Sequence, residues 1–106
     1  MHHYSYRAFT IVPSAEADPA SRCVIDGEID MTVVQAFRTA LFDEVRAGAT
    51  TTIDLSNVTF LGVGGLRALV EAREWAAQHD CRLHLVASPV VWRMLEIIGK
   101  AGDFNR

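Results

Sequence analysis

The chain has few of the features that place a protein in a membrane, on nucleic acid or outside the cell. No apolar run approaches the roughly 20 residues that span a bilayer, and the opening residues lack the basic-then-apolar layout of a secretion signal. Ten basic residues stand against 13 acidic ones, giving a net charge of −3, and the basic residues form no run that could follow a phosphate backbone. We therefore expect a cytoplasmic protein with no membrane insertion and no nucleic-acid partner.

Cysteine is also scarce. Cys23 and Cys81 are far apart in the sequence and show none of the close spacing that zinc sites use. In a cytoplasmic chain a structural disulfide is not expected. We interpret the two residues as buried or half-buried thiols, with a redox role of the pair as a subsidiary hypothesis. No metal and no cofactor is expected.

Half of the 106 residues are hydrophobic, which is enough for one continuous core in a single domain over residues 1–106. Aromatic and β-branched residues predict strands over 4–12, 22–26, 50–55 and 82–87. Apolar residues at three- and four-residue spacing predict helices over 31–46 and 65–79, and a third helix that starts after Ser88 as N-cap and ends at Gly99. The order β-β-α-β-α-β-α predicts an α/β fold: a four- to five-stranded mixed sheet with an N-terminal antiparallel strand and helices packed against it.

Residues 56–65 are predicted to form a loop rich in small residues. Asp54 closes the strand before it, and its carboxylate is expected to accept N–H bonds in the following turn. Val58 and Phe60 alternate with polar residues, so both are expected to anchor the loop. The helix that begins near Gly64-Gly65 directs unsatisfied N–H groups at the loop, a favourable place for negative charge.

The run from Ile53 to Leu66 resembles the signature of STAS domains. In that family a strand ends in Asp-Leu-Ser-x-Val-x-Phe-apolar, and Asp-Ser-Ser/Thr-Gly-Leu opens the next helix. The matching residues here are Asp54, Leu55, Ser56, Val58, Phe60, Leu61, Gly65 and Leu66. Upstream, Gly27-Glu28-Ile29-Asp30 is similar to the family's Gly-Glu-Leu-Asp turn before its first helix. The resemblance covers essentially the whole chain and implies a STAS fold.

The sequence departs from the family at one segment, which reads Gly62-Val63-Gly64-Gly65. The position that would carry the family's phosphoacceptor hydroxyl is Gly64, which cannot be phosphorylated, and Gly62 replaces the aspartate. A subsidiary hypothesis is that Thr59 or Ser56 serves as an alternative phosphoacceptor, although local hydrogen bonding at the strand end is the favoured role of Ser56. The resemblance implies a partner-binding loop made of Asp30, Ser56, Asn57, Thr59, Gly62, Val63, Gly64, Gly65 and Arg67.

Within the family, the chain resembles bacterial anti-sigma factor antagonists. These bind an anti-sigma factor of the histidine-kinase-like ATPase type and so release a sigma factor for transcription. Glycine at residue 64 would mimic the permanently unphosphorylated, binding-competent state. The alternative is a STAS accessory subunit that docks on a transporter or on a lipid-transport ABC ATPase. The sequence does not select between a monomer and a weak dimer.

Two other functions fit the residues poorly. A dinucleotide-binding loop at Gly62-Val63-Gly64 needs a third glycine where Arg67 stands, and an acid at the end of the next strand, where Ala87-Ser88 stands. For catalysis, no recognisable motif pairs Ser56, Cys23 or Cys81 with a base. His84 alternates with leucines in a predicted strand, which favours a half-exposed structural residue. We therefore predict a binding protein and not an enzyme.

Overall fold

The computed structural model describes residues 4–5, 9–12, 20–47 and 50–104. Their elements, in chain order, are β1 (Tyr4–Ser5), β2 (Phe9–Val12), β3 (Ala20–Ile29), α1 (Val34–Ala47), β4 (Thr50–Leu55), β5 (Val58–Leu61), α2 (Val63–Gln78), β6 (Arg82–Ala87), α3 (Pro89–Ile97) and the 3-10 helix η1 (Ala101–Asp103). Within this part of the chain no helix is long and apolar enough to cross a membrane.

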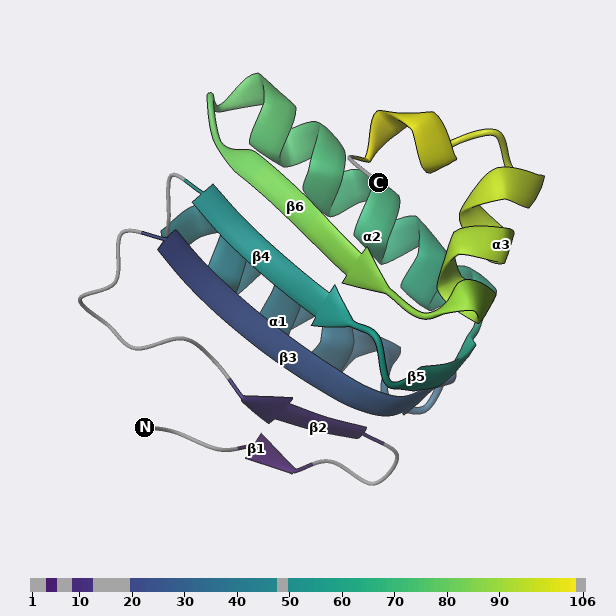
Figure 1. Ribbon diagram of the computed structural model, residues 1–106. Coiled ribbons are helices and arrows are strands. Elements are labelled where there is room, and N and C mark those ends of the chain that lie inside the picture. The colour runs from purple at the N-terminus through teal and green to yellow at the C-terminus, as the bar shows by residue number, and fades with distance from the viewer. Residues whose placement is uncertain (1–3, 6–8, 13–19, 48–49, 105–106) are drawn as a thin grey trace.

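The strands form one six-stranded sheet in the order β1-β2-β3-β4-β6, and β5 pairs with β3 beyond the end of β4 (Figure 1). Strands β3 to β6, which carry the helices between them, pair with one another only in parallel. The short strands β1 and β2 pair with each other, and β2 with β3, in the antiparallel sense.

The predicted four- to five-stranded mixed sheet with one N-terminal antiparallel strand is therefore wrong. The sheet has six strands, and its helix-bearing part is entirely parallel. The single strand predicted over 4–12 is two strands, β1 and β2, and residues 6–8 lie outside the described residues. The predicted loop over 56–65 contains β5 and the first turn of α2. A four-residue strand shows too little alternation to be recognised from its sequence.

A shift in register explains how β5 presents its side chains. The pairing of β3 with β5 slips between Gly27 and Glu28, and Gly27 has φ of 113°, a conformation that favours glycine. As a result Val58 and Leu61 are buried, while Phe60 is 48% exposed. The prediction that Val58 anchors this segment is confirmed, and the same prediction for Phe60 is wrong.

Helices α1 and α2 lie side by side behind one face of the sheet, and no described helix crosses in front of the other face (Figure 1). The core between them is continuous. Its largest fully buried side chains are Phe37 and Leu41 from α1, Leu69 from α2, Leu95 from α3, and Ile25, Ile29, Ile53 and Leu55 from the sheet.

Ser88 holds the end of β6 against the sheet. It stands at the N-cap position of α3, but its side chain makes no capping hydrogen bond. Its Oγ instead donates to the carbonyl oxygen of Val58 at 2.7 Å, a buried contact. The prediction that Ser88 is the N-cap residue is therefore confirmed, and its hydroxyl group donates to β5 while making no capping hydrogen bond.

Candidate partner-binding site

The chain leaves β3 and enters α1 through Asp30. The Asp30 Oδ1 accepts hydrogen bonds from the Thr32 N–H at 3.0 Å and from the Thr32 hydroxyl at 2.6 Å. The Asp30 carbonyl oxygen accepts the Val33 N–H at 3.2 Å. This fixed turn projects Met31 outward, with 85% of its surface exposed.

The start of α2 is tied to the same place. The Gly62 N–H donates to the Ile29 carbonyl oxygen at 2.9 Å, next to Asp30. Gly62 is the N-cap residue, so no side chain caps α2, and its first turn holds no acidic residue. A helix start leaves its first N–H groups without partners inside the helix, and no acidic side chain of the first turn offsets their partial positive charge here.

Gly64 permits α1 and α2 to approach closely. A Cβ atom on Gly64 would lie 2.9 Å from Val34 Cγ2, closer than carbon atoms pack. A Cβ atom on Gly65 would lie 2.7 Å from Leu61 Cδ1 and 2.9 Å from Ile29 Cγ2. Gly64 is exposed and Gly65 is buried. At Gly64 the surface is thus bare backbone, and the space for a side chain is taken by Val34.

Large apolar side chains surround this bare surface. Met31 is 85% exposed, Val63 70% and Phe60 48%, and they come from the turn before α1, the first residue of α2 and β5. We call Asp30, Met31, Phe60, Gly62, Val63 and Gly64 the docking face. Exposed large apolar side chains make the docking face a candidate interaction surface.

Sequence reasoning missed two members of the docking face. Met31 was assigned to the first turn of a helix, whereas α1 starts three residues later. Phe60 was predicted to be an anchor, and only the register shift beside Gly27 turns it outward. No residue pattern signals that shift.

The polar residues predicted for the site divide into two groups. Asn57 and Thr59 lie beside Gly27: the Asn57 carbonyl oxygen accepts the Gly27 N–H at 3.3 Å, and the Thr59 hydroxyl lies 3.5 Å from the Gly27 carbonyl oxygen that it contacts. Arg67 is exposed on α2 and shares the face of Val63 four residues earlier. Ser56, by contrast, is hydrogen-bonded to Asp54.

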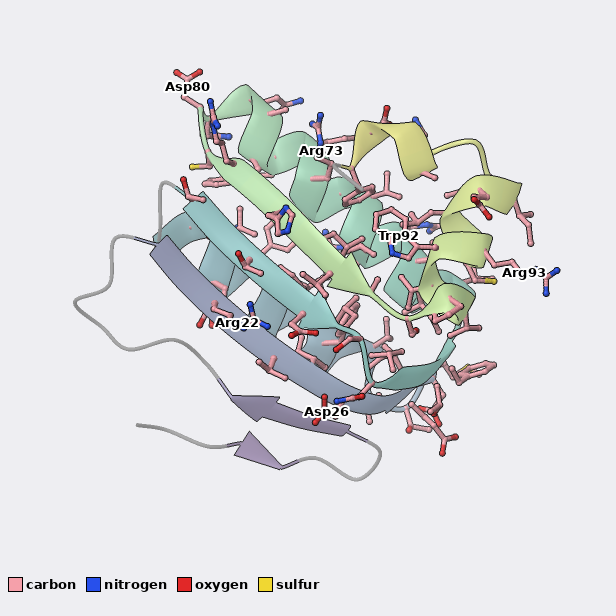
Figure 2. All side chains as sticks on the ribbon, in the orientation of Figure 1. Arg22, Asp26, Arg73, Asp80, Trp92 and Arg93 are labelled. Atoms are coloured by element: carbon pink, nitrogen blue, oxygen red, sulfur yellow. The ribbon has the colours of Figure 1, made fainter. Side chains whose placement is uncertain are left out.

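Asp54 is the anchor of the turn between β4 and β5. Its Oδ1 accepts the Ser56 N–H at 3.0 Å and the Ser56 hydroxyl at 2.6 Å, and its Oδ2 pairs with the Arg22 guanidinium, which Figure 2 shows on the helix-free face. Burial alone would raise the pKa of Asp54, but the Ser56 hydrogen bonds and the Arg22 charge together outweigh it and lower the pKa. The predicted turn-closing role of Asp54 is confirmed.

The two cysteines do not meet. Cys23 lies opposite Ile53, and Ile53 lies opposite Leu85, so Cys81 is two strands and four residues away. Strand spacings place their Cα atoms about 16 Å apart, well beyond the reach of a disulfide. Burial, reinforced by the negative charge of Glu44, raises the pKa of the Cys23 thiol to about 12. Of the two thiols, Cys81 is the more accessible, since it is half-buried and Cys23 is fully buried.

The described residues show no group of three His, Cys, Asp or Glu side chains placed to hold a metal ion. The arrangement around the docking face is that of a rigid surface: hydrogen-bonded turns, a close helix contact and exposed apolar side chains. Such a surface suits recognition of another protein.

Comparisons with solved structures give the same fold. The chain is similar to an anti-sigma factor antagonist from Mycobacterium paratuberculosis, with 29% identity, a TM-score of 0.80, and coverage of 92% of this chain and 83% of that one. It is also similar to an antisigma-factor antagonist STAS domain from Rhodobacter sphaeroides (19% identity, TM-score 0.63, 77% and 89% coverage). The unphosphorylated form of SpoIIAA, an anti-sigma factor antagonist of Bacillus, matches at 18% identity, TM-score 0.69 and 90% and 85% coverage.

No curated protein matches the chain. A family model described as "Mlab, STAS domain" matches residues 14–102, which include the docking face, strands β3 to β6 and the helices α1, α2 and α3. The chain therefore belongs to the STAS domain family, and the anti-sigma factor antagonists are among its structural neighbours.

Proposed function

We propose that this STAS domain is an anti-sigma factor antagonist. It binds an anti-sigma factor of the histidine-kinase-like ATPase type through the docking face and thereby releases a sigma factor for transcription in the bacterial cytoplasm. It acts by binding and not by catalysis. The similarity to the mycobacterial antagonist over 92% of the chain supports the assignment.

The observation that carries the proposal is the exposure of Met31, Phe60 and Val63 around bare glycine backbone. Exposing three large apolar side chains to water is unfavourable. A partner that covers them gains about 25 cal/mol of free energy for each Å² of apolar surface that it buries. The uncapped start of α2 adds N–H donors at the same place. A partner surface with an apolar pocket and an acidic or carbonyl acceptor at its rim fits both features.

We further propose that phosphorylation does not control this site. SpoIIAA is also known in a phosphorylated form. Gly64, at the position of the family phosphoacceptor, has no hydroxyl group, and Val34 fills the space that a side chain would need. The hydroxyl groups of the two alternative phosphoacceptors are engaged elsewhere: the Ser56 hydroxyl donates to Asp54, and the Thr59 hydroxyl contacts the Gly27 carbonyl oxygen. The docking face is therefore constitutively competent to bind, and its activity follows the amount of protein.

One observation favours a second candidate. The matching family model is described by the name Mlab and not as a regulator of sigma factors. The chain could then be a STAS accessory subunit that docks on a transporter or a lipid-transport ABC ATPase. Both candidates use a protein surface, so the identity of the bound ATPase separates them.

Affinity purification from a native lysate, followed by mass spectrometry, tests the choice. We expect wild-type protein to recover an anti-sigma ATPase, and Val63→Asp to lose it because a charge in an apolar interface is unpaired. Ile97→Asp is the matched control, since Ile97 is 73% exposed on α3 and Val63 is 70% exposed on α2. Recovery of an ABC ATPase, lost with the same variant, would establish the second candidate. If Val63→Asp retains the partner and Ile97→Asp loses it, the interface lies on α3 and not on the docking face.

A further inference from the structure

One edge of the sheet has no strand beside it in the described chain. Strand β6 pairs with β4 through Arg82 to Ala87 and ends the order β1-β2-β3-β4-β6 (Figure 1). It is six residues long, contains no proline and shows no register shift against β4. The outward backbone N–H and C=O groups of such an edge strand can pair with a further strand.

The direction of the backbone groups follows from one hydrogen bond. The Ser88 N–H donates to the Leu55 carbonyl oxygen of β4 at 3.2 Å. Because the backbone groups of a strand alternate in direction, those of His84 and Val86 also face β4, whereas those of Leu83 and Leu85 face away from it. The Cys81 N–H agrees with this alternation, since it turns away from the sheet to the Ala76 carbonyl oxygen at 2.9 Å.

A cavity of about 570 Å³ lies at the N-terminal half of this edge. It contacts Leu83, which faces the helices, and also Arg82 and His84, which face the opposite side of the sheet, so it passes around the edge of β6. On that opposite side it extends as far as Thr50 and Thr52 of β4. The wall across from the strand is formed by Arg73 and Ala77 of α2.

The cavity carries a positive balance of charge. Arg82 is exposed, and Arg73, which Figure 2 shows between α2 and η1, uses only its Nε in its contact with the Asp103 carbonyl oxygen at 2.6 Å. The carboxylate of Asp103, the acid in the lining, lies 3.9 Å from the Lys100 Nζ, which offsets it. Two guanidinium groups therefore flank the open backbone edge.

We propose that β6 is a second interaction site, which binds an extended acidic segment of a partner protein as a seventh strand. The backbone N–H and C=O groups of Leu83 and Leu85 supply the ladder hydrogen bonds, and Arg82 and Arg73 select acidic side chains at the two sides of the added strand. This site is separate from the docking face. It lies at the far end of α2, and that helix of 16 residues is about 24 Å long.

Amide hydrogen exchange and chemical shifts of ¹⁵N-labelled full-length protein test the proposal. In the free protein, the amides of Leu83 and Leu85 should exchange faster than those of His84 and Val86, which are bonded to β4. An acetylated hexapeptide of alternating valine and glutamate is the probe, with alternating valine and lysine as its control. The acidic peptide should shift and protect Leu83 and Leu85, and should bind at least fivefold more tightly than the basic one.

Arg82→Glu should reverse that preference, whereas Arg93→Glu, an exposed arginine of α3, should leave it unchanged. Val63→Asp should also leave it unchanged, so failure of the docking face and failure of this site are distinguishable. The proposal is overturned if the acidic peptide produces no shift at Leu83 and Leu85 at millimolar concentration, or if the two peptides bind equally. It is also overturned if Leu83 and Leu85 are already protected in the free protein in a concentration-dependent way, because a second copy of the chain then occupies the edge.

Discussion

A single methyl group added at Gly64 should push apart the first turns of α1 and α2, which lie beside the docking face. The Cβ atom of Gly64→Ala would lie 2.9 Å from Val34 Cγ2 and 3.6 Å from Val34 Cβ. Carbon atoms pack at about 3.5–4.0 Å, so the contact must open by more than half an ångström. Val34 is the first residue of α1 and has a branched, stiff side chain, so the strain passes to the helix backbone.

The expected free energies follow from two opposing effects. Overpacking of this kind costs about 1–3 kcal/mol. Replacing glycine by alanine in a helix gains up to about 1 kcal/mol, and less in the first turn, where Gly64 lies. Gly64→Ala should therefore lower the free energy of unfolding by about 0.5–2 kcal/mol in the wild-type background. In a Val34→Ala background the clash is gone, and the same change should be neutral or stabilising.

Urea unfolding of the four proteins in this double-mutant cycle measures the coupling. We expect a coupling free energy of about 1–2 kcal/mol, with Gly64→Ala destabilising only when Val34 is present. If the two substitutions add within about 0.5 kcal/mol, the close helix contact does not exist as described and the explanation of Gly64 fails. Gly65→Ala, whose Cβ would meet Leu61 and Ile29 in the core, should be more damaging than Gly64→Ala.

Three further predictions concern Asp54, the two cysteines and Ser88. Because the pKa of Asp54 is lower in the folded chain than its unfolded value of about 4, its contribution to stability is present above that pH and is lost as the pH falls through the folded pKa. Urea unfolding from about pH 2 to 7 should therefore show that the free energy of unfolding falls more steeply with decreasing pH for wild type than for Asp54→Asn. An equal pH dependence of the two proteins would contradict the role of the Ser56 and Arg22 contacts. Iodoacetamide at mildly alkaline pH should modify Cys81 and spare Cys23, which is fully buried, so intact-mass analysis should find one adduct on the native chain and two in urea. Ser88→Ala should lower the free energy of unfolding by about 1–3 kcal/mol, since it leaves a buried carbonyl oxygen of β5 without its donor, and an unchanged urea midpoint would refute this.

The sequence predicts well where local chemistry decides the structure. Asp54 followed by Ser56 is sufficient to form the turn after β4, because a carboxylate two residues before an N–H group closes it without help from the rest of the fold. The helix α1 is predicted for a similar reason, since its apolar stripe alone identifies the face that the sheet buries.

Features set by strand pairing are outside the reach of the sequence. Phe60 and Val58 look alike in the pattern, and only the slip of register at Gly27 separates an exposed ring from a buried side chain. Ser88 looks like a helix cap, but a strand 30 residues earlier takes its hydroxyl. In the same way, the sequence shows only that Gly64 has no hydroxyl group. The structure shows that Val34 of α1 occupies the space that a side chain on Gly64 would need.

The central claim is that the docking face displaces a sigma factor without a phosphorylation switch. The direct measurement mixes the chain with a preformed complex of its anti-sigma ATPase and sigma factor, with ATP present, and follows free sigma factor over time. The account predicts release that persists through prolonged incubation with ATP, is abolished by Val63→Asp and is unchanged by Ile97→Asp. Release that decays as phosphate is added to the chain, or no release by the wild type, would contradict it.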